Sequence, residues 1–329
     1  MKTPRVVFHL AAFAICVLAP FVGSTSINLY SAFNFEIPFS DNIDAQILFI
    51  ARIPRVIAGA LVGAALATSG VVLQALLRNP LATPFTLGVS AGGSLGAILV
   101  IVLGFSVSSP FVPTVALASF IGSLTAVSIV YYLARFRGNR LSTNVLLLAG
   151  VTLNSLFSAT IMFVQYMADY TQSFYSIRWL MGNLDVSGYT PIISALPLLL
   201  VAFAVFCYLP RALNVLTLGA DSASARGVNV LATQRLAFFS ASLATGAAVA
   251  IGGPIGFIGI IIPHAVRIFV GADHRVVLPI SASLGAAFLV ICDIGARTIL
   301  SPVELPVGVI TAMFGGPFFL WILVRNQQN

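Results

Sequence analysis

The chain has 329 residues, of which 59% are hydrophobic and 8% are charged, and its mean hydropathy is +1.05. A soluble domain carries about 25% charged residues, so this composition excludes an ordinary water-soluble fold. The net charge of +7 is distributed between apolar stretches and forms no basic face with interleaved aromatics, which excludes nucleic acid as a partner and indicates membrane topology instead.

Apolar stretches of about 20 residues, the length that a helix needs to cross the hydrocarbon core, recur along the chain. The first, at residues 6–28, shows no clear small-residue cleavage site, so we interpret it as a retained helix. The others are predicted at residues 54–77, 87–104, 111–134, 143–167, 190–209, 235–252, 255–270, 276–297 and 306–324. With no alternating strand pattern, the fold class is an all-α polytopic membrane protein of about ten transmembrane helices, a single domain over residues 1–329.

The basic residues predict the orientation of this domain. With the N-terminus inside, the cytoplasmic segments hold twelve of them: Lys2, Arg5, Arg78, Arg135, Arg137, Arg140, Arg211, Arg226, Arg235, Arg267, Arg275 and Arg325. The outside holds four: Arg52, Arg55, Arg178 and Arg297. Because cytoplasmic segments carry the excess of basic residues, both termini are expected in the cytoplasm of a bacterium, with the chain in its inner membrane.

An internal repeat emerges when the sequence is shifted by 183 positions. Gly63-Ala64-Ala65 then aligns with Gly246-Ala247-Ala248, and further identities pair Gly70 with Gly253, Pro80 with Pro263 and Gly88 with Gly271. Five predicted spans separate the two segments, so they cross the membrane in opposite directions. We therefore predict two inverted five-helix halves, at about residues 1–170 and 190–329, with small residues at the helix contacts.

Chemistry-bearing motifs are few. Lys2 is the only lysine, so a phosphate-binding loop is excluded and any ATP must be hydrolysed by another subunit. Asp293, the only acid well inside a span, precedes Arg297 by four residues, which favours a helical ion pair over a proton relay. The cysteines and histidines show no metal-ligand spacing, and no catalytic set stands out. We expect no enzymatic activity, no bound cofactor and no metal.

Five stretches are more specific than generic membrane sequence. They are Arg52-Ile-Pro-Arg55 with Gly63-Ala-Ala-Leu-Ala; Arg78-Asn-Pro-Leu-Ala82 with Leu87-Gly88; Leu218-Gly-Ala-Asp-Ser-Ala-Ser-Ala-Arg-Gly227; Gly256-Phe-Ile-Gly259 through Pro263-His264 to His274-Arg275; and Glu304-Leu-Pro-Val-Gly308 with Gly316-Pro317. In this order, over residues 50–324, the chain resembles the FecCD-type, or type II, ABC importer permeases for iron-siderophore, haem and cobalamin uptake. The resemblance implies a second permease chain (the same or a different one), two ATP-binding subunits that carry ATP and Mg, and a periplasmic substrate-binding protein.

The resemblance also assigns roles to individual residues. Arg52, Arg55 and Arg297 match outward-facing arginines that pair with acidic knobs on the binding protein, a task that suits guanidinium groups. The inner gate is matched by Asn79, Leu81, Ser142 and Thr143.

A cytoplasmic loop of short helices at residues 213–230 is expected to dock into the ATPase. Its matching residues are Leu218, Gly219, Ala220, Asp221, Ser222, Ala225, Arg226 and Gly227. The alanines favour a helix, Asp221 is an expected helix cap, and Gly219 and Gly227 are expected to interrupt the helices of the loop. The fifth span is expected to line the substrate pathway with uncharged hydrogen-bonding groups, namely Asn154, Ser155, Ser158, Thr160 and Gln165.

No motif separates the cargoes that this family carries. We take ferric siderophores as the expected cargo because they are the commonest in the family, with cobalamin or haem as alternatives. A stand-alone secondary carrier is a further alternative from another class, and the shortage of buried carboxylates argues against it. A scaffold or sensor that moves nothing fits the inverted repeat poorly.

Overall fold

The computed structural model describes residues 3–34, 36–106, 112–135 and 143–326, and these ranges contain helices and no strand. Six helices are long and apolar enough to cross a membrane by length and composition. Four shorter apolar helices, at Arg5–Phe21, Val89–Leu103, Ile258–Val270 and Val307–Trp321, account for the other predicted spans. The prediction of an all-α polytopic membrane protein is confirmed.

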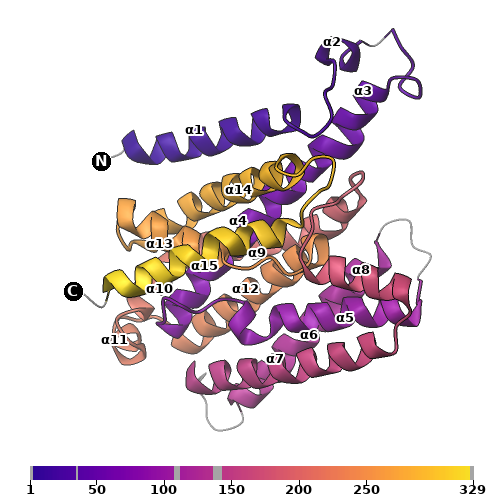
Figure 1. Ribbon diagram of the computed structural model, residues 1–329. Coiled ribbons are helices and arrows are strands. Elements are labelled where there is room, and N and C mark those ends of the chain that lie inside the picture. Colours follow the sequence, from indigo (N-terminus) through magenta and orange to yellow (C-terminus); the bar gives the residue numbers. More distant parts are fainter. Residues whose placement is uncertain (1–2, 35, 107–111, 136–142, 327–329) are drawn as a thin grey trace.

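The helices are joined mostly by short connections. Their bounds are α1 (Thr3–Leu18), η1 (Ala19–Phe21), α2 (Leu29–Ala32), α3 (Ile43–Gln46), η2 (Ile47–Arg52), α4 (Ile53–Leu77), η3 (Phe85–Leu87), α5 (Val89–Leu103), α6 (Thr114–Arg135), α7 (Thr143–Tyr166), α8 (Tyr170–Leu180), α9 (Thr190–Tyr208), α10 (Pro210–Leu216), α11 (Ala220–Ala225), α12 (Val230–Gly252), α13 (Ile258–Val270), α14 (His274–Thr298) and α15 (Val307–Asn326). Figure 1 places both marked chain ends at one end of the bundle, together with α11, and we call this the terminal end. The opposite end, which carries α2, α3 and α8, is the distal end. Chain ends on the same side agree with an even number of crossings.

Two predicted span limits need correction. The first span was expected to run to residue 28, but α1 stops at Leu18 and the chain turns through η1. Pro20 lies in that turn, and a proline lacks the N–H that a continuing helix needs. The seventh span was expected from residue 235, whereas α12 begins at Val230, because Asn229 caps it by accepting a hydrogen bond from the Ala232 amide at 3.0 Å.

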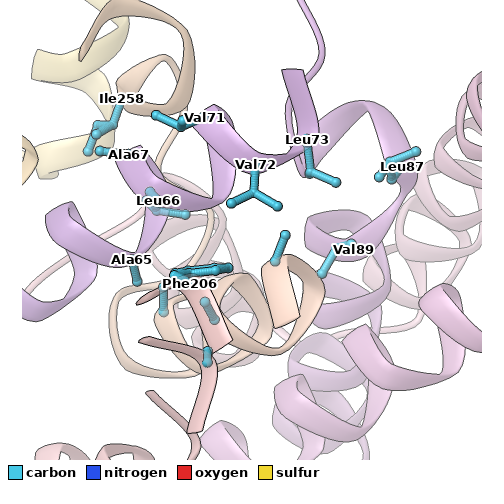
Figure 2. Packing of buried hydrophobic residues seen from close by; sticks show 14 of the residues in the cluster. Ala65, Leu66, Ala67, Val71, Val72, Leu73, Leu87, Val89, Phe206 and Ile258 are labelled. Atoms are coloured by element: carbon cyan, nitrogen blue, oxygen red, sulfur yellow. The ribbon is translucent and has the colours of Figure 1, made fainter. Parts of the chain in front are cut away.

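The centre of the bundle is α4, most of whose residues are buried and which packs against α12, α13 and α14. A Cβ atom at Gly63 would lie 2.2 Å from the carbonyl oxygen of Gly285, and one at Gly70 would lie 2.1 Å from that of Gly259. Only glycine permits such an approach, so the predicted small-residue contacts are confirmed. Aliphatic side chains fill the space around them, with Leu66, Val71 and others of α4 next to Phe206 and Ile258 (Figure 2).

The two helices that the shift of 183 positions aligns, α4 and α12, run in opposite directions. Leu76 and Gln234 line one cavity, while Gly59 and Gly252 both face Leu184, so the end of each helix lies beside the start of the other. After this pair, the shift of 183 positions no longer aligns one helix with another. The segment between α4 and α5 comprises residues 78–88, whereas the segment between α12 and α13 comprises only residues 253–257. The connections differ in length, so one fixed shift does not align the elements after them.

Candidate functional site

Charged side chains meet at the distal end. Arg55 lies in the first turn of α4, and Asp293 and Arg297 lie one turn apart near the end of α14. Arg55 Nε is 2.9 Å from Asp293 Oδ1, and Arg55 Nη1 is 2.7 Å from Glu304 Oε2. Arg297 Nε is 3.1 Å from Asp293 Oδ2, which confirms the predicted ion pair within the helix. We call these four residues, together with Arg52, the distal charge cluster.

Arg52 lines the same cavity as Arg55, Arg297 and Glu304, and its guanidinium is held by backbone carbonyl groups. Its Nη1 donates to the carbonyl of Pro20 at 3.2 Å, and its Nη2 donates to the carbonyl of Thr25. A Cβ atom at Gly23 would lie 2.7 Å from the guanidinium carbon of Arg52, so the chain passes directly over this side chain. Arg52 therefore fixes the segment after α1 to the start of α4.

The predicted outward-facing arginines are in fact buried. Their exposed fractions are 5% for Arg52, 7% for Arg55 and 4% for Arg297, and that of Asp293 is 2%. The three side chains are thus largely covered in the single chain, and their shared location at one end is as expected; their docking role stays a prediction. A charge removed from water requires a partner, so the guanidiniums turn inward to the carboxylates and carbonyls.

A cavity of about 170 Å³ opens beside the cluster and is lined by its three arginines, Glu304, Asp185 and the chain around Gly23. Arg297 Nη2 is buried and has no hydrogen-bond partner among the described residues. The cluster holds three guanidiniums and two carboxylates, so one positive charge is not balanced within it. A carboxylate that entered the cavity would supply both the missing acceptor and the missing charge.

Sequence reasoning missed the part played by Glu304. This residue is 249 positions from Arg55, and no local spacing relates the two. The available signal was its place in the Glu304–Gly308 stretch, which the resemblance had already singled out. At the rim of the cavity, Asp185 pairs with Arg178 at 2.9 Å, and both side chains are about half exposed.

The predicted gate residues lie at the terminal end. After α4, Arg78 adopts a left-handed conformation (φ 48°), which turns the chain. Asn79 Oδ1 accepts a hydrogen bond from the Leu81 amide at 2.9 Å, so these two residues form one tight turn. Thr143 begins α7, and Ser142 lies outside the described residues.

A second cavity, of about 540 Å³, connects this region to the predicted coupling loop. Its lining comes from the ends of four segments: Leu76 and Arg78 at the end of α4, Thr143 and Asn144 of α7, Leu216 and Leu218–Ser222, and Gln234 of α12. The structure thus brings Thr143 beside the coupling loop, whereas Asn79 and Leu81 are not part of this lining.

The coupling loop contains the short helices that the sequence indicated, α10 and α11. Gly219 (φ 113°) precedes α11 and Gly227 (φ 79°) follows it, conformations that favour glycine. The predicted capping role of Asp221 is wrong: Gly219 is the N-cap, no side chain caps the helix, and Asp221 lies in its first turn. A carboxylate there still favours the helix through its dipole.

Asn214 ties the coupling loop to the start of α14. Its Nδ2 donates to Asp273 Oδ1 at 2.7 Å, and its Oδ1 accepts from the His274 amide at 2.8 Å. Hydrogen bonds from Arg275 and Asn214 hold the pKa of the Asp273 carboxyl well below its ordinary value. Since α14 carries Asp293 and Arg297 near its other end, one helix joins the coupling loop to the distal charge cluster.

The predicted pathway residues of α7 are less available than expected. Asn154 Nδ2 donates to the carbonyl of Phe85 at 2.8 Å, so this amide nitrogen holds a loop, while the predicted place of Asn154 on the pathway stays a prediction. Ser155 and Thr160 donate to carbonyls of their own helix, as hydroxyl groups inside helices commonly do. Ser158 is exposed and Gln165 is half-buried.

Other chemistry-bearing groups are dispersed. In the described part of the chain, no group of three or more His, Cys, Asp or Glu side chains is arranged to hold a metal ion. The three cysteines are free. His9 contacts Ser283, His264 packs against Phe318, and His274 contacts Asn214, so the histidines serve separate helix contacts.

Known proteins resemble the chain along nearly its whole length. The profile of the FecCD transport family matches residues 10–325. The hemin transport system permease HmuU of Yersinia pestis is 42% identical over 284 residues, which are 84% of this chain and 83% of the relative. The cobalamin import system permease BtuC of Halobacterium salinarum is 45% identical over 277 residues, or 84% of this chain and 73% of the relative.

A solved structure gives the same result for the fold. It is described as an inward-facing conformation of a metal-chelate type ABC transporter, with a TM-score of 0.87 and 30% identity over 99% of this chain and 100% of that one. Profile, sequence and fold agree over the same helices. The chain belongs to the FecCD transport family and is an ABC importer permease.

Proposed function

We propose that this permease imports ferric siderophores, as one of two permease chains that assemble with two ATP-binding subunits and a periplasmic binding protein. The likeness to a metal-chelate type transporter supports an iron chelate as the cargo. The relatives named for hemin and cobalamin make those two compounds the alternative cargoes. ATP and Mg are assigned to the partner ATPase, and this chain supplies the path.

One observation carries the docking of a binding protein: the arginine-lined cavity at the distal end has an unpaired guanidinium nitrogen and one unbalanced positive charge. An acidic side chain of the binding protein satisfies both when it enters. Docking is then an insertion into a preformed pocket, because the cluster already fixes the arginines. At the terminal end, the coupling loop is assigned to the ATPase, and its bonds to α14 provide a link between the two.

Arg297→Gln is the substitution that tests docking most directly. It leaves Asp293 paired with Arg55 at 2.9 Å, so no buried carboxylate is left without a partner. We expect the loaded binding protein to bind the reconstituted complex at least about tenfold more weakly, since a charged hydrogen bond contributes about 1.5–3 kcal/mol. Arg178→Gln removes a charge from the exposed Arg178–Asp185 pair and is the control. Equal weakening by both variants would mean that general charge, not the pocket, attracts the binding protein.

Uptake measurements decide the cargo. A strain that lacks the gene is tested with labelled ferric siderophores, haem and cobalamin, and each loss is checked by restoring the wild-type gene. Loss confined to a siderophore supports the proposal, and loss of haem or cobalamin uptake replaces the cargo while keeping the importer. If the purified chain transports cargo with no ATP-binding subunit bound, it is a stand-alone carrier and the proposal fails.

The proposed orientation puts the terminal end, with both chain ends, in the cytoplasm. Its support is the location of the chain ends beside α11 (Figure 1) and the excess of arginine in the segments assigned to the cytoplasm. In a variant without native cysteines, a membrane-impermeant thiol reagent should label Val303→Cys in whole cells and Leu218→Cys only after lysis. Both native side chains are more than half exposed in the single chain, and the experiment leaves out the ATP-binding subunits so that they do not cover Leu218. The reverse labelling would invert the orientation.

A further inference from the structure

Asn154 connects two elements that are far apart in the sequence. It lies in the middle of α7, and its Nδ2 donates a hydrogen bond to the carbonyl of Phe85 at 2.8 Å, across 69 positions of sequence. Phe85 begins η3 and belongs to the loop between α4 and α5, residues 78–88, which also holds the Asn79–Leu81 turn. We call this segment the gate loop.

The backbone of α7 also lies directly against the gate loop. A Cβ atom at Gly150 would lie 2.1 Å from the Thr86 carbonyl oxygen and 2.8 Å from the Leu87 Cα, so only glycine allows this contact. Gly150 precedes Asn154 by four residues, which places both on one face of the helix. The face therefore holds the gate loop by a close approach and by a hydrogen bond.

Hydrogen bonds brace both parts of the gate loop. In the first part, Asn79 accepts from Leu81 N at 2.9 Å and from Ala82 N at 3.1 Å; in the second, Thr86 Oγ1 donates to Thr83 O at 2.7 Å and Gly88 N to Phe85 O at 3.2 Å. The two parts are joined directly by the peptide bond between Ala82 and Thr83, so a displacement of Phe85 reaches Leu81 through a short, braced stretch of backbone.

We propose that Asn154 is a positioning residue of the inner gate, whose bond to Phe85 makes the gate loop follow α7. Thr143 begins α7, about 16 Å along the helix from Asn154 at about 1.5 Å per residue. A rigid helix carries a displacement over that length, so Leu81 on the loop and Thr143 on the helix open and close together. The inference rests on the proposed import function and on the inner gate that the family resemblance implies at Asn79, Leu81 and Thr143, and it names the residue that couples the two sides of this gate.

The test measures the distance between the gate loop and the start of α7. In the complete complex with its ATP-binding subunits, in lipid, Cys16, Cys207 and Cys292 are replaced by serine and spin labels are attached at Leu81→Cys and Thr143→Cys. Pulsed EPR gives the distance between the labels with and without ATP. With Asn154 present, we expect one narrow distribution at the same distance in both states, because the gate loop follows α7. Asn154→Ala should raise the population with a displaced loop about tenfold, which is the factor that one lost hydrogen bond supplies.

A second variant and a control make the outcome decisive. Gly150→Ala keeps Asn154 but inserts a methyl group against Thr86, and it should broaden the distances in the same way. Thr152→Ala removes a hydroxyl that donates to a carbonyl of its own helix, that of Leu148, at 2.9 Å. This control variant should leave the distance distribution narrow. Both gate variants should also consume more ATP per cargo moved.

The outcomes separate this inference from the proposed function. If the distances in Asn154→Ala and Gly150→Ala are as narrow as those with the native residues and have the same value, the coupling role is overturned and the proposed import function stands. If ATP changes the distance between the labels even with Asn154 present, the gate loop moves independently of α7, and the coupling role is overturned as well. Cargo uptake is measured separately, so a wrong cargo affects neither result.

Discussion

The two ends of the bundle handle charge in opposite ways. At the distal end, Arg55, Asp293 and Arg297 are each less than one tenth exposed and are bonded to one another. At the terminal end, the Arg275–Asp273 pair lies near the surface, with side chains 61% and 35% exposed, and the link between elements is the neutral amide of Asn214. Both ends are joined by α14, whose first residues belong to one network and whose last turns belong to the other.

The difference shows which end is rigid. A buried charge pair is costly to break, because each partner left alone is an uncompensated charge, so the distal end keeps one geometry. The exposed Arg275–Asp273 pair and the hydrogen bonds of Asn214 contribute less, so the link between α10 and α14 yields more readily than the distal charge cluster. A rigid pocket suits the docking of a preformed partner, and a yielding loop suits a subunit that moves it.

Asp293→Asn should have the largest effect. It removes the carboxylate shared by Arg55 and Arg297, and loss of one partner from a buried pair costs about 3–5 kcal/mol. Asp185→Asn, in the exposed pair with Arg178, should cost about 0–1 kcal/mol. Thermal unfolding of the purified variants measures both. Equal losses would remove the contrast between buried and exposed charge on which the comparison depends.

Gly285→Ala should have a smaller effect and tests whether close packing, as well as charge, keeps α14 in place. A Cβ atom there would lie 2.5 Å from both the Gly63 carbonyl oxygen and the Ala67 Cβ, so the helices must separate, at a cost of about 1–3 kcal/mol. The matched control is Gly295→Ala in the same helix, whose nearest atom, Ile299 Cδ1, is 3.5 Å away. Thermal unfolding should show a loss of stability for Gly285→Ala and none for Gly295→Ala. A comparable loss for both would show that the contact with Gly63 and Ala67 is not its cause, because Gly→Ala within a helix otherwise favours the folded state.

Asn214→Ala should have the smallest effect on stability and a local one. It removes the bonds to Asp273 and His274 that attach α10 to α14, worth about 1 kcal/mol at this partly exposed site. Hydrogen exchange of residues 210–216 should accelerate about fivefold, with the distal end unchanged. Thr217→Val, which loses only a bond to the Asn214 carbonyl within its own segment, is the control. Faster exchange at the distal end as well would show that the two ends are not independent.

The predicted spans agree with the structure within a few residues over most of the chain. Their limits follow from runs of apolar residues, and a membrane helix satisfies its backbone groups locally, so composition decides where it can run. The exceptions have local causes that a hydropathy window averages out: Pro20 ends the first helix early, and the Asn229 cap starts α12 early. The Asp293–Arg297 pair was also predictable, because one helical turn separates the two residues.

The sequence by itself thus determined the membrane fold, the helices and the family to which the chain belongs. Only the tertiary structure decided that Arg55 bonds Asp293 and Glu304, that Arg52, Arg55 and Arg297 are buried, and that Asn154 holds the gate loop. These partners are 69 to 249 positions apart. The physical reason is that helix formation depends on neighbours within one or two turns, whereas the pairing of buried polar groups depends on how separate helices pack, which no local pattern records.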